Sequence, residues 1–282
     1  MDQELVDLLK RFIESNSIVP DLQFDPNIQP KLPVDPYSED YNEKKRTAHY
    51  LLLVASIDEG NVVGAADNAR KLMVRLYDHF GDEVFEITDG SVLRKVFHDI
   101  SSAIPLGRLR EMIPEILASV NRFVREKASG DIIGYSRRFE RPIEFVDVLA
   151  RSIERMGRSK NSVRKKAWMY MRWMVRGYPD LRIFDHFSPR GLFVPLDKNV
   201  AKVAACLGLI PSSKISNLGW KDVLRVTEFA RKLYPDDPAK VDYPFFLLGR
   251  KMGKLPLSAQ TLKRVLEISG VSSRKTGISG EN

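Results

Sequence analysis

Apolar residues recur at helical spacing along almost the whole chain. In residues 3–14, Leu5, Leu8, Leu9 and Phe12 fall on one face of a helix with about 3.6 residues per turn. This periodicity predicts an all-α fold, and we expect two helical lobes around a central cleft. Further helices are predicted over residues 44–57, 62–79, 89–99, 106–127, 142–157, 161–176, 198–208, 219–233, 240–250 and 257–269.

Signals for other kinds of structure are weak. The segment LFVPL (192–196) has β-branched and aromatic residues, but it is short and contains a proline. The phosphate-binding patterns GxGxxG and GxxxxGK[ST] do not occur in the sequence. No apolar run is long enough to span a membrane, and the amino terminus lacks the basic start and apolar core of a secretory signal. We therefore expect a cytoplasmic, monomeric protein that does not bind membranes.

Prolines interrupt the helical pattern in residues 16–43. Because each proline disfavours helix at and before its own position, this segment is predicted to be an extended connector or surface arm. The Ser- and Gly-rich end of the chain predicts a flexible tail. The expected organisation is an N-terminal helix with a Pro-rich arm over 1–43, a helical domain over 44–269 and the tail over 270–282.

Cysteine and histidine are scarce. Cys206 is the single cysteine, which excludes a disulfide framework, a thiolate zinc site and a four-cysteine iron–sulfur cluster within one chain. It falls on the apolar side of a predicted helix, as expected for a small buried side chain. The four histidines show no ligand-like spacing. We expect neither a metal nor another cofactor.

Basic residues concentrate in the stretch RSKNSVRKKAWMYMRWMVR (158–176). The whole chain has 45 Lys and Arg against 37 Asp and Glu, a net charge of +8 that is compatible with a polyanionic partner. In this stretch the cations alternate with Trp and Met, and Asn161 or Ser162 is predicted to be the N-cap of the helix. The apolar side chains can be core with a solvated cationic face. Alternatively, the stretch binds phosphate and presents a lysine that is deprotonated readily enough to act as a nucleophile.

Two segments resemble the helix-hairpin-helix superfamily of DNA glycosylases, in the branch related to archaeal 8-oxoguanine glycosylases. They are KKAWMYMRWMVR (165–176) and VPLDKNVAKVA (194–204). In that superfamily a lysine at the start of the helix after the hairpin attacks the sugar, and an aspartate opens a later core helix. The resemblance implies that Lys165 is the nucleophile and that Asp197, thirty-two residues later, is the assisting carboxylate. Lys166 is the alternative nucleophile.

Two further segments extend the resemblance to about residues 45–250. DDPAKVDYPFFLLGR (236–250) is similar to a late helix that lines the base pocket, and TAHYLLLVASIDEG (47–60) is similar to the opening core helix. The resemblance implies base-pocket roles for Asp242 and Phe246, which lie one helical turn apart, and we expect Trp168 and Met169 to join them. The expected DNA contacts are Arg158, Lys160, Arg164, Lys166 and Lys198.

The region before the lysine departs from the family pattern. The usual glycine-rich hairpin, LPGVGxK, is replaced by RMGRSKNSVRKK (155–166), in which Gly157 is the single glycine. The function implied is base-excision repair of double-stranded DNA by an N-glycosylase with lyase activity at abasic sites, acting on a flipped-out base. An oxidised purine is the first expectation for that base, and modified pyrimidines are equally open chemically. The alternatives are a non-catalytic nucleic-acid-binding protein of the same fold and a helical protein-interaction module.

Overall fold

The regular elements of the chain are all helical in the computed structural model, which describes residues 2–58 and 67–272. The all-α prediction is confirmed for these ranges, where no strand forms. Residues 62–66 of the helix predicted over 62–79, and residues 273–282 of the predicted tail, lie outside them. The chain divides into two compact units. We call Met1–Val19, Asn161–Val163 and Phe193–Asn282 the terminal unit, and Pro20–Lys160 and Arg164–Leu192 the central unit.

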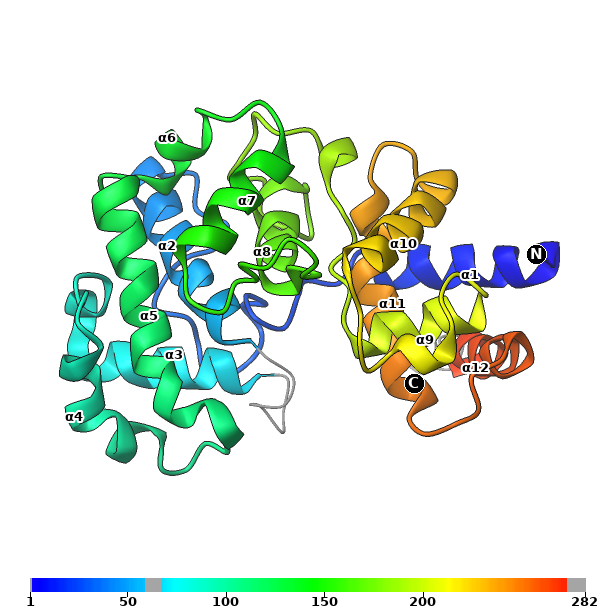
Figure 1. The fold of residues 1–282 in the computed structure, drawn as a ribbon, viewed down its shortest axis with the longest axis horizontal. Helices are drawn as coiled ribbons and strands as arrows, with labels where there is room; N and C mark the ends of the chain where they lie inside the picture. Colours follow the sequence, from blue (N-terminus) through cyan, green and yellow to red (C-terminus); the bar gives the residue numbers. More distant parts are fainter. Residues whose placement is uncertain (1, 59–66, 273–282) are drawn as a thin grey trace, which may run out of the picture. The chain divides into compact units, whose positions relative to one another are not determined.

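Helix α2 (Tyr41–Ile57) is the core of the central unit. It packs against α3, α5, α6 and α8 (Figure 1). The Asp40 carboxylate accepts a hydrogen bond from Glu43 N at 2.9 Å and so caps the start of α2. Nearly all side chains of its second half are buried. The other helices of this unit are α3 (Asn68–Phe80), α4 (Gly90–Ser101), α5 (Ile113–Arg122), α6 (Ile132–Ser136), α7 (Pro142–Ser152) and α8 (Lys165–Val175).

Helix α11 (Asp242–Met252) occupies the same position in the terminal unit. It packs against α1 (Gln3–Asn16), α9 (Lys198–Cys206) and α12 (Ala259–Ser272), and α10 (Trp220–Leu233) completes the unit. The first helix of the chain therefore shares a core with the last one. Cys206 belongs to that core, and burial raises the pKa of its thiol to about 11, as expected for an unreactive buried side chain.

The Pro-rich segment connects α1 to α2, one of the two predicted roles, but it is part of the central unit and does not form a surface arm. Phe24 is fully buried, and Asp21 and Val34 are buried as well. Arg70 has no exposed surface, and its guanidinium binds several backbone carbonyl groups of this segment. It donates hydrogen bonds to the carbonyl oxygens of Leu22, Asp25, Ile28 and Pro30 at 2.5–3.0 Å. A segment without helix or strand can be buried only when its carbonyl groups find such donors.

Several predicted helix boundaries also differ from the structure. The helix predicted over 106–127 is divided into a 3-10 turn (Gly107–Met112), α5 and a π-turn (Phe123–Lys127), and the short helix α6 follows it. The helix predicted over 142–157 ends at Ser152. The helix predicted over 161–176 begins only at Lys165, and Arg164 rather than Asn161 or Ser162 takes the N-cap position.

A hydrogen-bonded histidine joins α2 to α5. His49 Nε2 lies 2.8 Å from Asn121 Oδ1. The Asn121 amide nitrogen donates to the carbonyl oxygens of Val84 and Ile87, so its oxygen faces the ring and Nε2 carries the proton of the neutral imidazole. Burial of the ring lowers the pKa of His49 to about 4.

This histidine makes stability depend on pH. Because the folded-state pKa lies below the ordinary value of about 6.5, the unfolded chain binds the proton first as the pH falls. The stabilisation is complete above about pH 6.5 and is lost as the pH falls toward 4. We expect the free energy of unfolding to drop by about 2 kcal/mol more in the native protein than in His49→Gln between pH 7 and pH 4.5. Urea unfolding of both proteins measures this, and equal losses would contradict it.

Candidate active site

Helix α8 starts at Lys165 because of the backbone conformation of the residue before it. Arg164 has φ +49°, in the left-handed region that residues other than glycine seldom adopt. Its guanidinium forms an ion pair with Asp147 of α7. This anchor holds the turn and fixes the first turn of α8 against α7. Arg164 thus has a structural role in this unit, and its expected contact with DNA stays a prediction.

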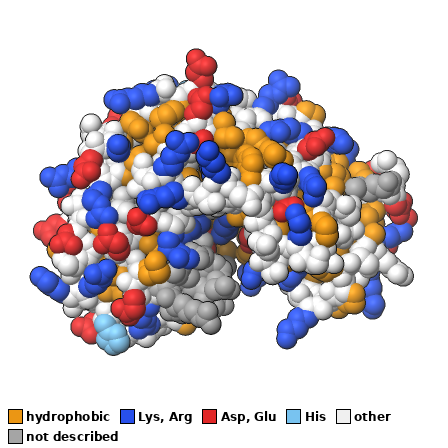
Figure 2. Space-filling model, in the orientation of Figure 1, with side chains coloured by type: hydrophobic (Ala, Val, Ile, Leu, Met, Phe, Trp, Pro, Cys, Tyr) orange, Lys and Arg blue, Asp and Glu red, His pale blue; other side chains and the backbone are white. Residues whose placement is uncertain are grey.

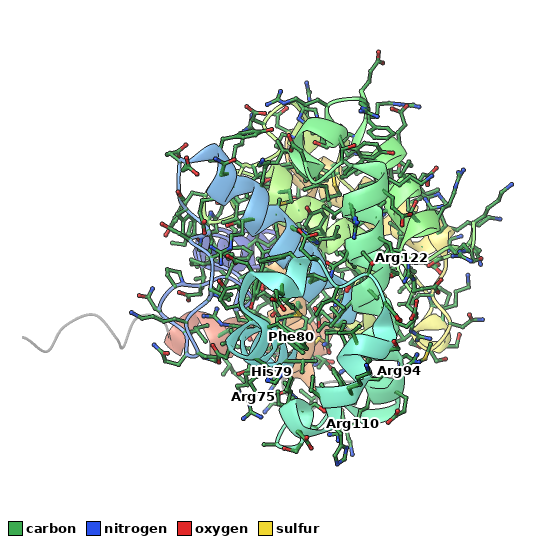
Figure 3. All side chains as sticks on the ribbon, turned by 90° about the vertical axis from the view of Figure 1, so that its left-hand side faces the viewer. Arg75, His79, Phe80, Arg94, Arg110 and Arg122 are labelled. Atoms are coloured by element: carbon green, nitrogen blue, oxygen red, sulfur yellow. The ribbon has the colours of Figure 1, made fainter. Side chains whose placement is uncertain are left out.

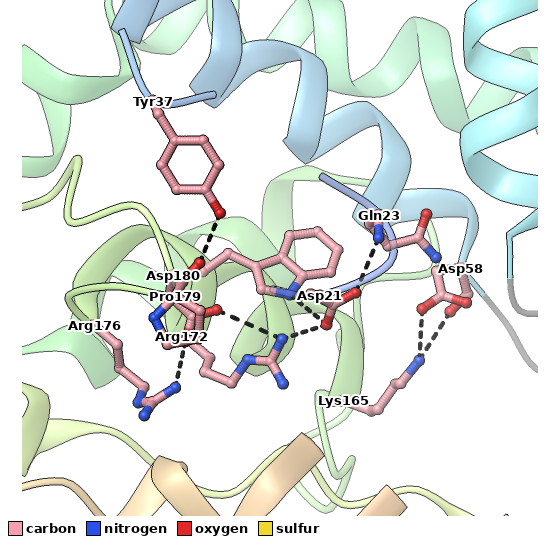
Figure 4. Close-up of polar contacts among 10 residues, drawn as sticks. Asp21, Gln23, Tyr37, Asp58, Lys165, Arg172, Arg176, Pro179 and Asp180 are labelled. Carbon is pink, nitrogen blue, oxygen red and sulfur yellow. Dashed lines mark hydrogen bonds and ion pairs between the residues drawn. The ribbon is translucent and has the colours of Figure 1, made fainter. Parts of the chain in front are cut away.

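The amine of Lys165 is held at the end of α2. Its Nζ lies 3.0 Å from Asp58 Oδ2 and 3.3 Å from the Asp58 carbonyl oxygen (Figure 4). Asp58 is the C-cap residue of α2, where the helix dipole also favours a cation. The Lys165 side chain keeps 23% of its surface exposed and that of Asp58 keeps 15%. The result is a lysine whose amine is held by a carboxylate and whose side chain is partly exposed.

Lys166 is placed quite differently. Its residue is 7% exposed, and its Nζ donates to the Ser56 carbonyl oxygen at 2.7 Å. An ammonium group in this position satisfies one of the carbonyl groups that the last turn of α2 leaves without a helical partner. The expected phosphate contact of Lys166 is therefore not supported, and its burial also makes it the less suitable of the two candidate nucleophiles.

The apolar side chains of α8 belong to the core. Trp168 has no exposed surface and Met169 has 6%. All residues from Lys166 to Val175 are buried. In this structure the two side chains pack the core of the central unit, and the base-pocket role expected for them stays a prediction.

The charged residues in the second half of α8 form a buried network. Arg172 forms an ion pair with Asp21 and lies 3.7 Å from an oxygen of Asp180, which pairs with Arg176 (Figure 4). Trp173 Nε1 donates to Asp21 Oδ2 at 3.0 Å. Burial raises the pKa of the Asp180 carboxyl, and the two arginines oppose that rise. These contacts hold the Pro-rich segment and the loop after α8 in place.

Two of the expected DNA contacts lie in the loop between α7 and α8. Arg158 and Lys160 are exposed, and Arg158 is 3.4 Å from Glu154 across an ion pair. Gly157 has φ +104°, a backbone conformation that strongly favours glycine. The chain thus turns between two helices that pack on each other and presents cations at the turn. In the terminal unit, Lys198 is exposed as well.

Asp197 caps α9, as its position in the sequence predicts. Its Oδ1 accepts hydrogen bonds from Asn199 N and Val200 N, both at 2.8 Å. Within residues 2–58 and 67–272, its Oδ2 has no hydrogen-bond or ion-pair partner. One oxygen therefore orients the carboxylate while the other is available to a ligand.

Helix α11 holds the two remaining candidates. Asp242 is its first residue and is buried, whereas Phe246 is only partly buried. The Phe246 ring stacks on that of Tyr243, with centroids 6.3 Å apart and an interplanar angle of 18°. The guanidinium of Arg250 lies 5.7 Å from the Phe246 centroid. Phe246 thus lies between Tyr243 and Arg250 in a partly exposed group of aromatic and cationic side chains.

A glycine sets the distance between α11 and the start of α9. A Cβ atom added at Gly249 would lie 2.2 Å from the carbonyl oxygen of Asn199, closer than any real contact. Asn199 is in the first turn of α9, which Asp197 caps. The helix that carries Asp242 and Phe246 is therefore in direct backbone contact with the turn that orients Asp197.

Several other arginines of the central unit donate hydrogen bonds to the backbone. Figure 3 shows four arginines on α3, α4, α5 and the 3-10 turn before α5: Arg75, Arg94, Arg110 and Arg122. Three of them donate to backbone carbonyl oxygens next to or within α4, namely those of Ile100, Ser101, Ile104 and Thr88. On the face drawn in Figure 2, Lys and Arg are interspersed with Asp and Glu. The net positive charge of the sequence does not by itself mark a binding face.

Asp58 is the site residue that sequence reasoning missed. Its segment was identified as a core helix, but nothing in the pattern links it to Lys165, 107 positions later. In the described ranges no group of three His, Cys, Asp or Glu side chains is arranged to hold a metal ion. None of the described helices is long and apolar enough to cross a membrane.

The fold and these side chains define an all-α protein of two helical units, with an ordered lysine in one and an oriented aspartate in the other. Residues 35–251 match the model of a family described as "Protein of unknown function (DUF2400)". The chain belongs to that family, since the match covers more than half of it. No curated protein and no solved structure matches the chain.

The contact at Gly249 generates a prediction. We expect Gly249→Ala to lower the free energy of unfolding by about 1–3 kcal/mol, because α11 and α9 must move apart. Gly177→Ala is the matched control, since a Cβ atom there meets nothing within 4 Å. Denaturant unfolding of the two variants measures the difference. A Gly249→Ala protein as stable as the control would show that the two helices are not in rigid contact.

Proposed function

We propose that this protein is a DNA base-excision glycosylase with lyase activity at abasic sites, built on a helix-hairpin-helix arrangement. The observation that carries the proposal is the state of the two lysines at the start of α8. Lys165 has a partly exposed side chain with its amine held by a carboxylate, whereas Lys166 is buried and donates to a backbone carbonyl. This difference supports Lys165 as the nucleophile.

The loop between α7 and α8 supports a DNA-binding role. Helices α7 and α8 pack on each other, and their connection contains Gly157 in a left-handed conformation. Arg158 and Lys160 are exposed in the same loop and would contact backbone phosphates, together with Lys198 at the start of α9. Each phosphate contact should steepen the salt dependence of binding by about one unit of log–log slope.

The proposed reaction begins with a nucleotide flipped out of the duplex. The Lys165 amine attacks C1′, and the base leaves with the electron pair of the glycosidic bond. Positive charge develops on the sugar, and the uncommitted oxygen of Asp197 would stabilise it. Opening of the ring gives a Schiff base, from which elimination of the 3′ phosphate follows.

Base recognition is assigned to α11. The partly exposed Phe246 ring would stack on the flipped base, and Asp242, one turn earlier, would hydrogen-bond to its edge. A panel of duplexes with single lesions, oxidised purines first and modified pyrimidines second, identifies the base.

Borohydride trapping tests the nucleophile. A covalent complex should form with DNA that contains the excised base, disappear in Lys165→Gln and persist in Lys166→Gln, because only Lys165 presents its amine. Gel separation of the trapped complex measures this, and circular dichroism checks that both variants are folded.

Other trapping results would favour the other interpretations. A complex lost in a folded Lys166→Gln protein but retained in Lys165→Gln would move the nucleophile by one residue. Tight, salt-sensitive DNA binding without trapping on any substrate of the panel would favour a non-catalytic nucleic-acid-binding protein. Absence of DNA binding as well would favour a protein-interaction module.

Asp197 provides a second test. Asparagine is as good an N-cap as aspartate, so Asp197→Asn should leave stability and DNA binding nearly unchanged. Base release in single-turnover assays should fall by a factor of about 100 or more, because the charge facing the sugar is lost. Normal release per folded molecule, together with a stability loss of about 1 kcal/mol, would reduce Asp197 to a helix cap.

A further inference from the structure

We propose that Asp58 is a positioning residue for Lys165: it holds the ammonium group before DNA binds and accepts its proton when the amine attacks. This inference rests on the proposed function and adds a residue to it. Three observations lead to it: the contact between the two side chains, their partial exposure, and the way in which the neighbouring charges are already committed.

The contact is specific to Lys165. Its Nζ reaches both Oδ2 and the carbonyl oxygen of Asp58, at 3.0 and 3.3 Å. An ammonium group bound at two points on one residue has a defined position, although its side chain is long and flexible. Since 23% of the lysine side chain is exposed, the amine can leave this position without opening the core.

The other charged groups around the first turn of α8 have their own partners. On α7, Asp147 pairs with Arg164 and lies 3.5 Å from Arg151. Lys166 donates to the Ser56 carbonyl oxygen. Asp58, the C-cap residue of α2, places a carboxylate oxygen 3.0 Å from the Lys165 amine.

The proton transfers of the proposed step balance. The ammonium gives one proton to Asp58, and the lone pair so freed forms the bond to C1′ while the base leaves with the glycosidic electron pair. A second proton goes from the attached nitrogen to the departing base. Ring opening transfers the proton held by Asp58 to O4′ and leaves the third on the Schiff-base nitrogen. Asp58 ends as a carboxylate, ready for the next cycle.

The test is the pH dependence of trapping in Asp58→Asn. Without the carboxylate the ammonium is less stabilised, so the acid limb of the trapping rate should move to lower pH by about one unit or more. The rate at high pH should fall several-fold, because the amine is no longer held in position. Asp58→Glu should bring the limb back toward that of the native protein. Asp185→Asn, which removes a carboxylate from an exposed ion pair with Arg137, is the control and should leave the limb unchanged.

The outcomes separate this inference from the proposed function. If the native protein forms no trapped complex, the proposed function fails and this inference fails with it. If the native protein is trapped and Asp58→Asn has the same pH profile, Asp58 is only a structural cap and the proposed function stands. If Asp58→Asn is less stable than the native protein but its acid limb is unshifted, Asp58 is again only a structural cap. Urea unfolding measures this loss of stability.

Discussion

Helix α8 is buried along nearly its whole length while it carries several cations, and the central unit is organised by the need to compensate them. A buried charge is tolerated only when it is paired and hydrogen-bonded. Each cation of the helix and its flanks therefore recruits a group from another segment. Arg172 forms an ion pair with Asp21 of the Pro-rich segment, and Arg176 forms one with Asp180. Arg164 forms an ion pair with Asp147 of α7. The end of α2 receives Lys165 and Lys166. Removing one partner from such a network costs about 3–5 kcal/mol, because the other charge remains buried.

Lys165 differs from the other cations of this set because its side chain is partly exposed. The other cations are enclosed, and their partners make them part of the fold. Lys165 has a comparable ion pair at its amine, yet a quarter of its side chain reaches solvent. The left-handed turn at Arg164 puts it at the first position of the helix, before the buried run begins. The contacts that fix α8 thus also place the Lys165 amine at the start of the helix, beside the Asp58 carboxylate.

The sequence predicted those features that depend on local pattern. Helix periodicity located nearly all the long helices, and the position of Asp197 before an apolar helix predicted a cap that the structure confirms. Burial of the Pro-rich segment could not be predicted, because its carbonyl groups are satisfied by Arg70 of a helix more than forty residues later. The start of α8 was placed four residues early, since a left-handed Arg164 has no sequence signature. Asp58 was missed for the same reason as Arg70: both act through contacts between distant segments.

The cap at Asp197 shows how one carboxylate can serve the fold and remain reactive. Two backbone N–H groups donate to Oδ1, which fixes the orientation of the carboxylate. If both oxygens accepted hydrogen bonds from the helix, the carboxylate would have no acceptor left for a ligand. Because Gly249 lets α11 lie against the same turn, the backbone behind the cap has little room to shift. In the proposed reaction Oδ2 would therefore meet the developing charge without reorganisation, the condition under which electrostatic stabilisation is most effective.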